Sequence, residues 1–341
     1  MVILILISLT SCKEKELVRY ESEFIILFDT VTRIVGFAHS KEEFKEYAQV
    51  IYDNLKEYHQ LYDIYNDYEG INNIKTINDN AGIKPVKVDQ RIIDLLKFSK
   101  EVYEKTNGET NIAFGAVLKI WHEYRTEGID DPDNASLPPI EELKKAAEHT
   151  NIEDIIIDEK ASTVFLRDPL MSLDVGAVAK GYATEQVSKI VREKGLTSGL
   201  LSVGGNVRAI NNNIVTGDSW NVGVQDPNSP RGQSILKLVK IDDMSMVTSG
   251  DYERYYVVNG EKYNHIIDKD TLYPAEYFSA ITIICEDSGM ADALSTATFA
   301  MPFEEGMEFI NSLPGTEAMW VFTDGTIKYS ENFESYIKEQ S

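Results

Sequence analysis

The chain has 341 residues, enough for one large domain or two ordinary domains that each bury a sizeable apolar core. Asp and Glu number 56 against 33 Lys and Arg, which gives a formal net charge of -23. Such an acidic protein repels the phosphate backbone of nucleic acids, so we discount nucleic-acid binding. A phosphate ligand would require a divalent cation, a helix N-terminus or a few well-placed cationic side chains.

The N-terminus combines a short apolar run with an early cysteine. Residues 1–9 are mostly aliphatic, and a charged cluster directly follows Cys12. The run is shorter than the ~20 residues of a membrane-spanning helix and matches the core of a signal peptide. Residues 9–12, Leu-Thr-Ser-Cys, resemble a bacterial lipobox, which predicts that residues 1–11 are a signal peptide and that Cys12 carries a lipid. The alternative is a buried N-terminal strand with an incidental cysteine.

Helical periodicity recurs along the chain. Over residues 41–65, apolar and aromatic side chains recur at spacings of three and four, which predicts an amphipathic helix. Residues 89–106 show the same pattern and end before Asn107 and Gly108, which is typical of a helix stop. Further helices are predicted at residues 115–125, 139–149, 178–193 and 291–301.

Short β-rich runs lie between these helices. Asn259 and Gly260 separate two such runs, which is a strong hairpin signal. Hairpins with interspersed helices indicate an α+β fold and not a doubly wound parallel sheet. Residues 127–139, rich in Asp, Gly and Pro, are predicted to form a surface loop or a seam between lobes. The predicted strands are 155–157, 164–166, 199–203, 222–224, 235–241, 255–258, 281–285 and 319–322.

Three segments have the residue types of a ligand site. In residues 173–182, a carboxylate and a Gly-Ala turn lead into a predicted helix with Lys180 one turn in, which suits a phosphate. Taken alone, that segment is better explained as an ordinary strand-turn-helix junction with a surface lysine. Residues 202–206 carry a glycine pair that fits either a close ligand approach or a plain turn. His265 follows the hairpin and could be a proton shuttle or a structural residue.

A fourth segment places Asp292 and Thr296 four residues apart on a predicted helix. This spacing projects a carboxylate and a hydroxyl from one face, and both are the hard oxygen donors that Mg²⁺ prefers. The alternative is that Asp292 caps the helix and Thr296 bonds its own backbone. Cys285, inside an apolar run, is most simply a small buried hydrophobe.

Taken in this order, residues 173–182, 202–206, 248–252, 263–268 and 292–296 resemble the ApbE family of FAD:protein FMN transferases. The resemblance covers nearly the whole mature chain. It implies an α+β fold in which mixed or antiparallel sheets and surrounding helices enclose an FAD cleft. Residues 23–341 would form this domain, and residues 12–22 would be a tether close to the anchor.

The resemblance also implies roles for single residues. Asp174 and Lys180 would contact FAD, and the Ala177 carbonyl would hold Mg²⁺ together with Asp292 and Thr296. His265 would lie beside the reacting phosphate as the candidate base, assisted by Lys180, with Asp268 orienting His265 or a water. Further ligand contacts would come from Phe28, Tyr65, Thr110, Asn111 and Ile266. Phe28 replaces a family methionine, and Thr110 and Asn111 replace a Phe-Asp pair.

The implied reaction is Mg²⁺-dependent transfer of FMN from FAD to a threonine hydroxyl of an acceptor protein with an FMN-binding domain, which releases AMP. Family members sit on the outer face of the cytoplasmic membrane, in keeping with the lipobox. One alternative is an FAD pyrophosphatase, which presents water in place of threonine. A second is a flavin-binding lipoprotein without catalytic activity.

Overall fold

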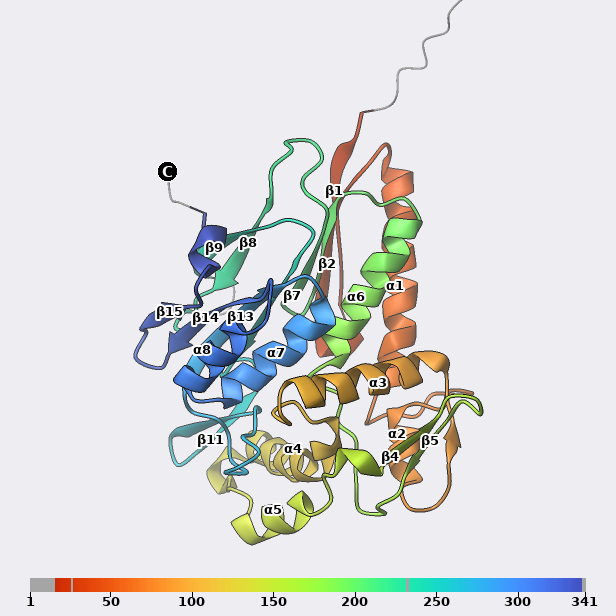
Figure 1. Cartoon of the computed structure of the whole chain (residues 1–341), viewed down its shortest axis with the longest axis vertical. Coiled ribbons are helices and arrows are strands. Elements are labelled where there is room, and N and C mark those ends of the chain that lie inside the picture. The colour runs from red at the N-terminus through yellow and green to blue at the C-terminus, as the bar shows by residue number, and fades with distance from the viewer. Residues whose placement is uncertain (1–15, 26, 231–232, 339–341) are drawn as a thin grey trace, which may run out of the picture.

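The fold is described from a computed structural model over residues 16–25, 27–230 and 233–338 (Figure 1). Its main sheet has eight strands in the order β1-β2-β6-β7-β10-β13-β14-β15, and all of the paired neighbours are antiparallel. The predicted α+β class is confirmed. The strands are β1 (Val18–Ile25), β2 (Val31–Ala38), β6 (Gly199–Val203), β7 (Asn206–Ile210), β10 (Ser245–Gly250), β13 (Phe278–Cys285), β14 (Glu317–Phe322) and β15 (Ile327–Tyr329).

Three small sheets accompany the main one. The predicted hairpin at Asn259 and Gly260 is confirmed, because both residues have positive φ, 52° and 87°, between two antiparallel strands. The strands of these sheets are β3 (Val86–Lys87), β5 (Thr163–Leu166) and β4 (Ile155–Asp158), then β8 (Trp220–Gln225) with β9 (Ile235–Ile241), and β11 (Tyr255–Val258) with β12 (Glu261–Asn264).

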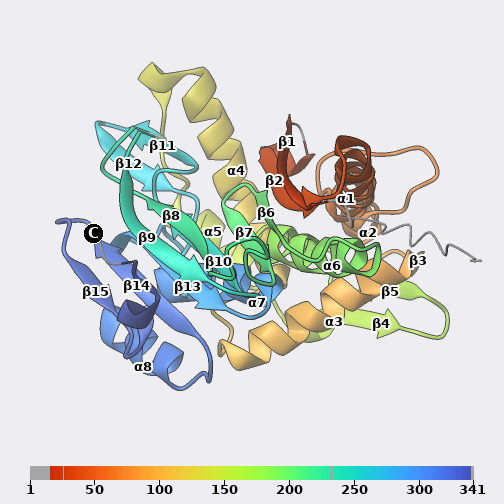
Figure 2. The same ribbon diagram turned by 90° about the horizontal axis from the view of Figure 1, so that it is seen from above.

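Helices cover one face of the main sheet, and the β8–β9 ribbon packs on the other (Figures 1 and 2). Helices α1, α6 and α7 form the covering layer, and their contact with the sheet positions the site described below. The helices are α1 (Lys41–Tyr62), α2 (Ile74–Asp79), α3 (Gln90–Lys105), α4 (Gly115–Asp130), α5 (Ile140–Ala147), α6 (Ala179–Glu193), α7 (Ser288–Ala300) and α8 (Phe303–Asn311).

Local chemistry sets the ends of these helices. The Ser40 hydroxyl caps α1 by accepting the Glu43 amide at 3.1 Å. Helix α1 ends before the predicted residue 65 because the Asp63 carboxylate accepts the amides of Tyr65 and Asn66, at 2.7 and 3.1 Å. Asp63 therefore turns the chain out of the helix and fixes the backbone of Tyr65.

Three boundary predictions need correction. The loop predicted over 127–139 is wrong for residues 127–130, because α4 continues to Asp130, and Gly128 gives Tyr256 of β11 room to pack on it. The predicted tether of residues 12–22 is too long, because β1 begins at Val18 and pairs with β2. Asp292 is not a helix cap, because α7 begins at Ser288 and Asp287 caps it by accepting the Met290 amide.

Cys285 is buried in β13, as predicted, and burial raises the pKa of its thiol to about 12. No helix within the described residues has the length and apolar character to cross a bilayer. The predicted signal peptide, residues 1–11, and the predicted lipidation site Cys12 lie outside the described residues.

Candidate active site

A cleft of about 970 Å³ opens beside the contact between α6 and α7. The start of α6, helix α4, the loop that follows α1 and the loop that follows β12 form its walls. Asp268 does not line it. The cleft does bring together the other described residues that the resemblance singled out, namely Phe28, Tyr65, Thr110, Asn111, Asp174, Ala177, Lys180, His265, Ile266, Asp292 and Thr296.

Helices α6 and α7 touch at Gly181, where there is no room for a side chain. A Cβ atom there would lie 2.3 Å from the Ser288 carbonyl oxygen and 2.4 Å from Asp292 Cβ. The close approach lets the Gly181 amide donate to Asp292 Oδ2 at 2.8 Å. Gly181 lies in the first turn of α6, where an amide has no partner within the helix, so Asp292 satisfies it. The Ala177 carbonyl precedes the helix and accepts no backbone amide within the described residues, so it is available to another partner.

The Asp292 carboxylate is a buried charge with little compensation. The residue is 3% exposed, and burial raises its pKa, an effect that the Lys180 ammonium and the Gly181 amide oppose. The side-chain amide of Asn206 also lowers this pKa. Its buried nitrogen has no hydrogen-bond partner within the described residues. A buried carboxylate in this condition is stabilised by a cation.

Two further oxygen atoms complete a set that fits Mg²⁺. Thr296 lies one turn after Asp292, and its hydroxyl donates to the Asp292 carbonyl at 3.3 Å, which leaves its lone pairs available. With the Ala177 carbonyl, the set is one carboxylate, one hydroxyl and one carbonyl, and Mg²⁺ completes such a set with water and substrate phosphate. Across the described ranges there is no cluster of three or more His, Cys, Asp and Glu that could hold a metal.

The start of α6 offers a site for phosphate. Its N-cap residue, Val178, makes no side-chain capping bond. In the first turn the Ala179 amide donates to the Val175 carbonyl at 2.8 Å and the Gly181 amide to Asp292, so among the described residues the Lys180 amide is the donor left for a ligand. Asp174 shapes the turn before it, because Asp174 Oδ1 accepts the Gly176 amide at 2.8 Å. Lys180 follows within the first turn and lines the cleft. A diphosphate would therefore meet the Lys180 amide, the positive end of the helix dipole and the Lys180 ammonium group together.

His265 lies among cations. Burial, and then the charges of Arg254, Lys180 and Arg125, lower the pKa of His265 to about 3, so its imidazole is neutral at physiological pH. The partner of its Nδ1 is the Arg254 carbonyl at 3.2 Å. The expectation that Asp268 orients this ring is not supported, because Asp268 Oδ1 instead accepts the Asp270 and Thr271 amides, at 2.7 and 3.0 Å.

The polar groups of Thr110 and Asn111 have structural partners. The Thr110 hydroxyl donates to the Ala293 carbonyl of α7 at 2.9 Å. The Asn111 amide donates to the Thr150 carbonyl at 3.0 Å, and its oxygen accepts the Ala113 amide at 2.9 Å. These two residues therefore shape the cleft wall and leave little polar capacity for a ligand.

The mouth of the cleft carries a residue that sequence reasoning missed, His122. Tyr65 is 57% exposed, and its hydroxyl lies 2.8 Å from His122 Nδ1. His122 Nε2 lies 3.8 Å from Asp174 Oδ2. One feature of the sequence could have identified it. His122 follows Leu118 by four residues and Phe114 by eight, and this helical spacing puts a histidine on the apolar face of α4.

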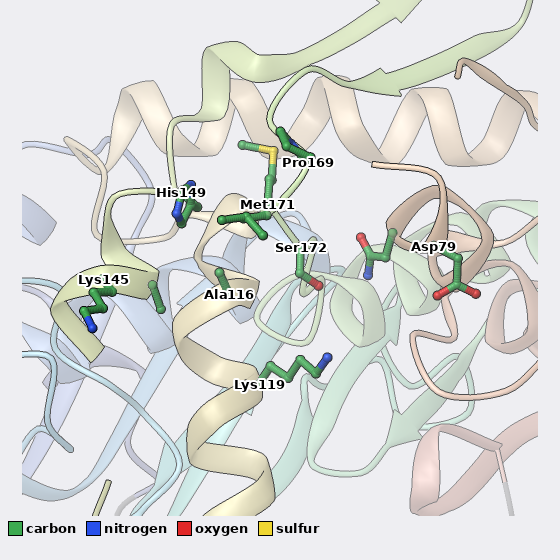
Figure 3. A pocket seen from close by; sticks show the side chains of 11 residues that line it. Asp79, Ala116, Lys119, Lys145, His149, Pro169, Met171 and Ser172 are labelled. Atoms are coloured by element: carbon green, nitrogen blue, oxygen red, sulfur yellow. The ribbon is translucent and has the colours of Figure 1, made fainter. Parts of the chain in front are cut away.

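A second hollow, of about 460 Å³, lies on another face of α4 (Figure 3). Its histidine, His149, is paired with Asp168 at 2.7 Å. Its two lysines, Lys119 and Lys145, are exposed. It therefore lacks the buried, poorly compensated charge that marks the first cleft.

Comparison with known proteins finds a matching family and similar relatives. Residues 28–320 match the model of the ApbE family. An FAD:protein FMN transferase of Treponema pallidum is 32% identical over 280 residues, 78% of this chain and 75% of that protein. One of Klebsiella pneumoniae is 29% identical over 267 residues, 77% of this chain and 80% of that protein.

Solved structures show the same fold. The ApbE protein of Thermotoga maritima has a TM-score of 0.81 at 31% identity and covers 94% of this chain and 100% of its own. The flavin transferase ApbE of Vibrio cholerae has a TM-score of 0.72 at 21% identity, covering 94% and 99%. The matched range contains every cleft residue described above, and we conclude that this chain belongs to the ApbE family.

Proposed function

We propose that this chain is an FAD:protein FMN transferase, which moves FMN from FAD to a threonine hydroxyl of an acceptor flavoprotein and releases AMP. The observation that carries the proposal is the buried Asp292 carboxylate, which faces Lys180 and the start of α6. The cleft, about 970 Å³, lies at the upper end of the range for small-molecule sites, as a dinucleotide requires. The two relatives named above are known by the same activity.

The Ala177 carbonyl, Asp292 and Thr296 would hold Mg²⁺. Bound there, the ion supplies positive charge next to the diphosphate of FAD. The chain itself supplies the remaining electrostatic stabilisation, because the Lys180 ammonium group, the Lys180 amide and the dipole of α6 bind and orient the diphosphate. Groups that are already in place when charge develops in the transition state usually supply the largest part of catalysis.

The transfer exchanges one phosphorus–oxygen bond for another. The threonine oxygen bonds to the FMN-side phosphorus, and the bond from that phosphorus to the bridging oxygen breaks, so AMP leaves with the bridging oxygen. The hydroxyl proton goes to the neutral His265 imidazole, which later releases it to solvent. Lys180 and Arg254 line the same cleft, and their positive charges would stabilise the negative charge that builds up on the departing AMP.

Incubation of the purified chain with FAD, Mg²⁺ and a bacterial FMN-binding domain that carries an acceptor threonine tests the reaction. We expect the acceptor to gain the mass of FMN less one water, and tryptic peptides to place the flavin on threonine. A threonine-to-alanine acceptor is the control. An acceptor that stays unmodified while AMP and FMN accumulate would favour the FAD pyrophosphatase.

Membrane attachment is a separate part of the proposal. The lipobox-like residues 9–12 indicate that Cys12 is lipidated and holds the enzyme on the outer face of the cytoplasmic membrane. Cys12→Ser should release the protein from the membrane fraction and leave its activity in solution unchanged. Retention of the variant in membranes would mean that residues 1–11 are an uncleaved anchor.

A further inference from the structure

Tyr65, His122 and Asp174 come from three separate segments and meet at the mouth of the cleft. Tyr65 lies in the loop after α1, His122 on α4, and Asp174 in the turn before α6. The distances are 2.8 Å from the Tyr65 hydroxyl to His122 Nδ1 and 3.8 Å from His122 Nε2 to Asp174 Oδ2. One imidazole thus bridges an exposed aromatic ring and a carboxylate.

Both ends of this bridge are fixed by the backbone. Asp174 Oδ1 accepts the Gly176 amide at 2.8 Å, so its other oxygen faces His122. At the far end, Asp63 Oδ1 accepts the Tyr65 amide at 2.7 Å. The backbone of Tyr65 is therefore held, and the hydrogen bond to His122 is what holds its half-exposed ring.

The protonation states of the three residues determine which atom donates and which accepts in each contact of this bridge. A carboxylate beside Nε2 favours the tautomer that carries its proton there, which leaves Nδ1 to accept from the Tyr65 hydroxyl. Burial lowers the pKa of His122, so the ring stays neutral and keeps this acceptor. Partial desolvation of the phenol at the cleft mouth, and then the Asp174 carboxylate, raise the pKa of Tyr65 to about 12, so the phenol keeps its proton.

We propose that His122 is a positioning residue that holds the Tyr65 ring across the cleft mouth, ready to pack against an aromatic ring of FAD. The inference rests on the proposed function, because FAD is the ligand. A tyrosine that rotates freely loses conformational freedom when a ligand packs on it, whereas a ring that is already held loses less. His122 therefore raises FAD affinity without touching the reacting atoms.

Two amide substitutions separate the two contacts of His122. In His122→Asn the amide oxygen can take the place of Nδ1 and accept from Tyr65, whereas in His122→Gln the amide reaches the place of Nε2, beside Asp174. We expect His122→Gln and His122→Phe to weaken FAD binding by about fivefold to tenfold, with kcat at saturating FAD changed less than about twofold. His122→Asn should retain most of the affinity. Quenching of flavin fluorescence measures Kd.

A double-mutant cycle tests whether His122 acts through Tyr65. Tyr65→Phe removes the same hydrogen bond from the other side, so the double variant with His122→Phe should lose no more FAD affinity than either single variant. Additive losses would overturn the proposal. His149→Phe is the matched control, because it breaks a histidine–carboxylate pair outside the cleft and should leave FAD affinity unchanged (Figure 3).

The outcomes for this inference and for the proposed function are distinct. A wild-type protein that binds no FAD overturns both. A wild-type protein that binds FAD and flavinylates the acceptor, with His122→Phe equal to it in FAD affinity, overturns only the role of His122. If His122→Phe fails to fold, the comparison of His122→Gln with His122→Asn decides the matter.

Discussion

The two walls of the cleft are built in opposite ways. The inner wall, which comprises Lys180, Gly181, Asp292 and Thr296, lies on two helices in direct contact, and its central carboxylate is 3% exposed. The outer wall, which comprises residues 28–30, Tyr65 and His122, comes largely from loops, and its central ring is 57% exposed. One cleft thus separates two tasks: the inner wall supplies fixed, buried charge, and the outer wall supplies an exposed aromatic ring that a hydrogen bond to His122 holds in place.

Buried polar contacts behind the inner wall explain why it is fixed. Arg208 of β7 donates to Glu185 of α6 at 3.0 Å, and the same carboxylate oxygen accepts the Ser288 amide of α7 at 3.1 Å. Glu185 and Arg208 are both buried, so their charges are paired and hydrogen-bonded away from water. One carboxylate thus ties both helices to the sheet.

The largest expected effect comes from removal of the inner-wall charge. Asp292→Asn should reduce transfer by about 10³-fold, because a metal carboxylate contributes several kcal/mol that no neighbour replaces. Burial raises the pKa of Asp292, so the metal-free folded state loses stability as pH rises above the ordinary range of a carboxyl group. The variant should therefore melt at or above the wild-type Tm in EDTA near neutral pH. A variant with wild-type turnover at limiting Mg²⁺ would remove Asp292 from the site.

His265 tests whether chemistry and binding can be separated. His265→Ala should lower kcat at saturating FAD by about 10²-fold while FAD affinity is retained, because the loss lies in the transition state. Turnover and fluorescence quenching measured on the same preparation report the two quantities. Turnover at saturation close to that of the wild type would mean that His265 is not the base.

The pH dependence of the same step follows from the pKa of His265. Since that pKa is about 3 in the unliganded protein, kcat/KM for FAD should not show a His265 acidic limb between about pH 5 and 8. The diphosphate of bound FAD offsets the surrounding cations and raises the pKa, so kcat should fall on the acidic side at a higher pH. An acidic limb near pH 6.5 in kcat/KM, the ordinary range of histidine, would contradict the lowered value.

The contact between α6 and α7 is the next target. Gly181→Ala forces a methyl group against the Ser288 carbonyl and Asp292, so we expect a loss of about 1–3 kcal/mol in unfolding free energy together with weaker Mg²⁺ dependence. Gly306→Ala on α8 is the matched control, because the nearest atom outside its own helix, Trp320 Nε1, would lie 3.7 Å from the added Cβ. Chemical denaturation and Mg²⁺ titration measure the two effects. A Gly181 variant as stable as Gly306→Ala would contradict the tight contact.

The sequence predicted the inner wall better than the outer one. Asp292 and Thr296 are four residues apart and Lys180 lies one turn into its helix, so their local spacing was enough to identify them as candidate site residues. Tyr65 and His122 are 57 residues apart, and no local pattern shows that an α1 loop meets α4. The sequence did not predict the contact between α6 and α7 at Gly181 for the same reason, because helix pairing is a tertiary property.

The missed strands have a similar cause. The predictions found β13, which is buried along its whole length, but missed β10, whose polar residues weaken any alternating pattern. In the fold these groups have partners: Thr248 pairs with the Thr282 hydroxyl at 2.9 Å, and Ser249 with that of Ser295 at 2.7 Å. The hydrogen-bond partners of these hydroxyls lie in segments that are distant in the sequence, so a local sequence pattern cannot predict them.

The smallest expected effect concerns the second inner-wall ligand. Thr296→Val keeps the shape of the side chain and removes its oxygen, so the metal would lose one neutral ligand while the Asp292 charge remains. We expect the Mg²⁺ concentration for half-maximal transfer to rise by about tenfold, with kcat largely restored at high Mg²⁺. The Thr296 hydroxyl also bonds the Asp292 carbonyl, so Thr296→Ser, which keeps the oxygen, is the control that separates ligation from packing. If Thr296→Val and Thr296→Ser have the same Mg²⁺ dependence as the wild type, the hydroxyl serves only its own helix, and water completes the coordination of the metal.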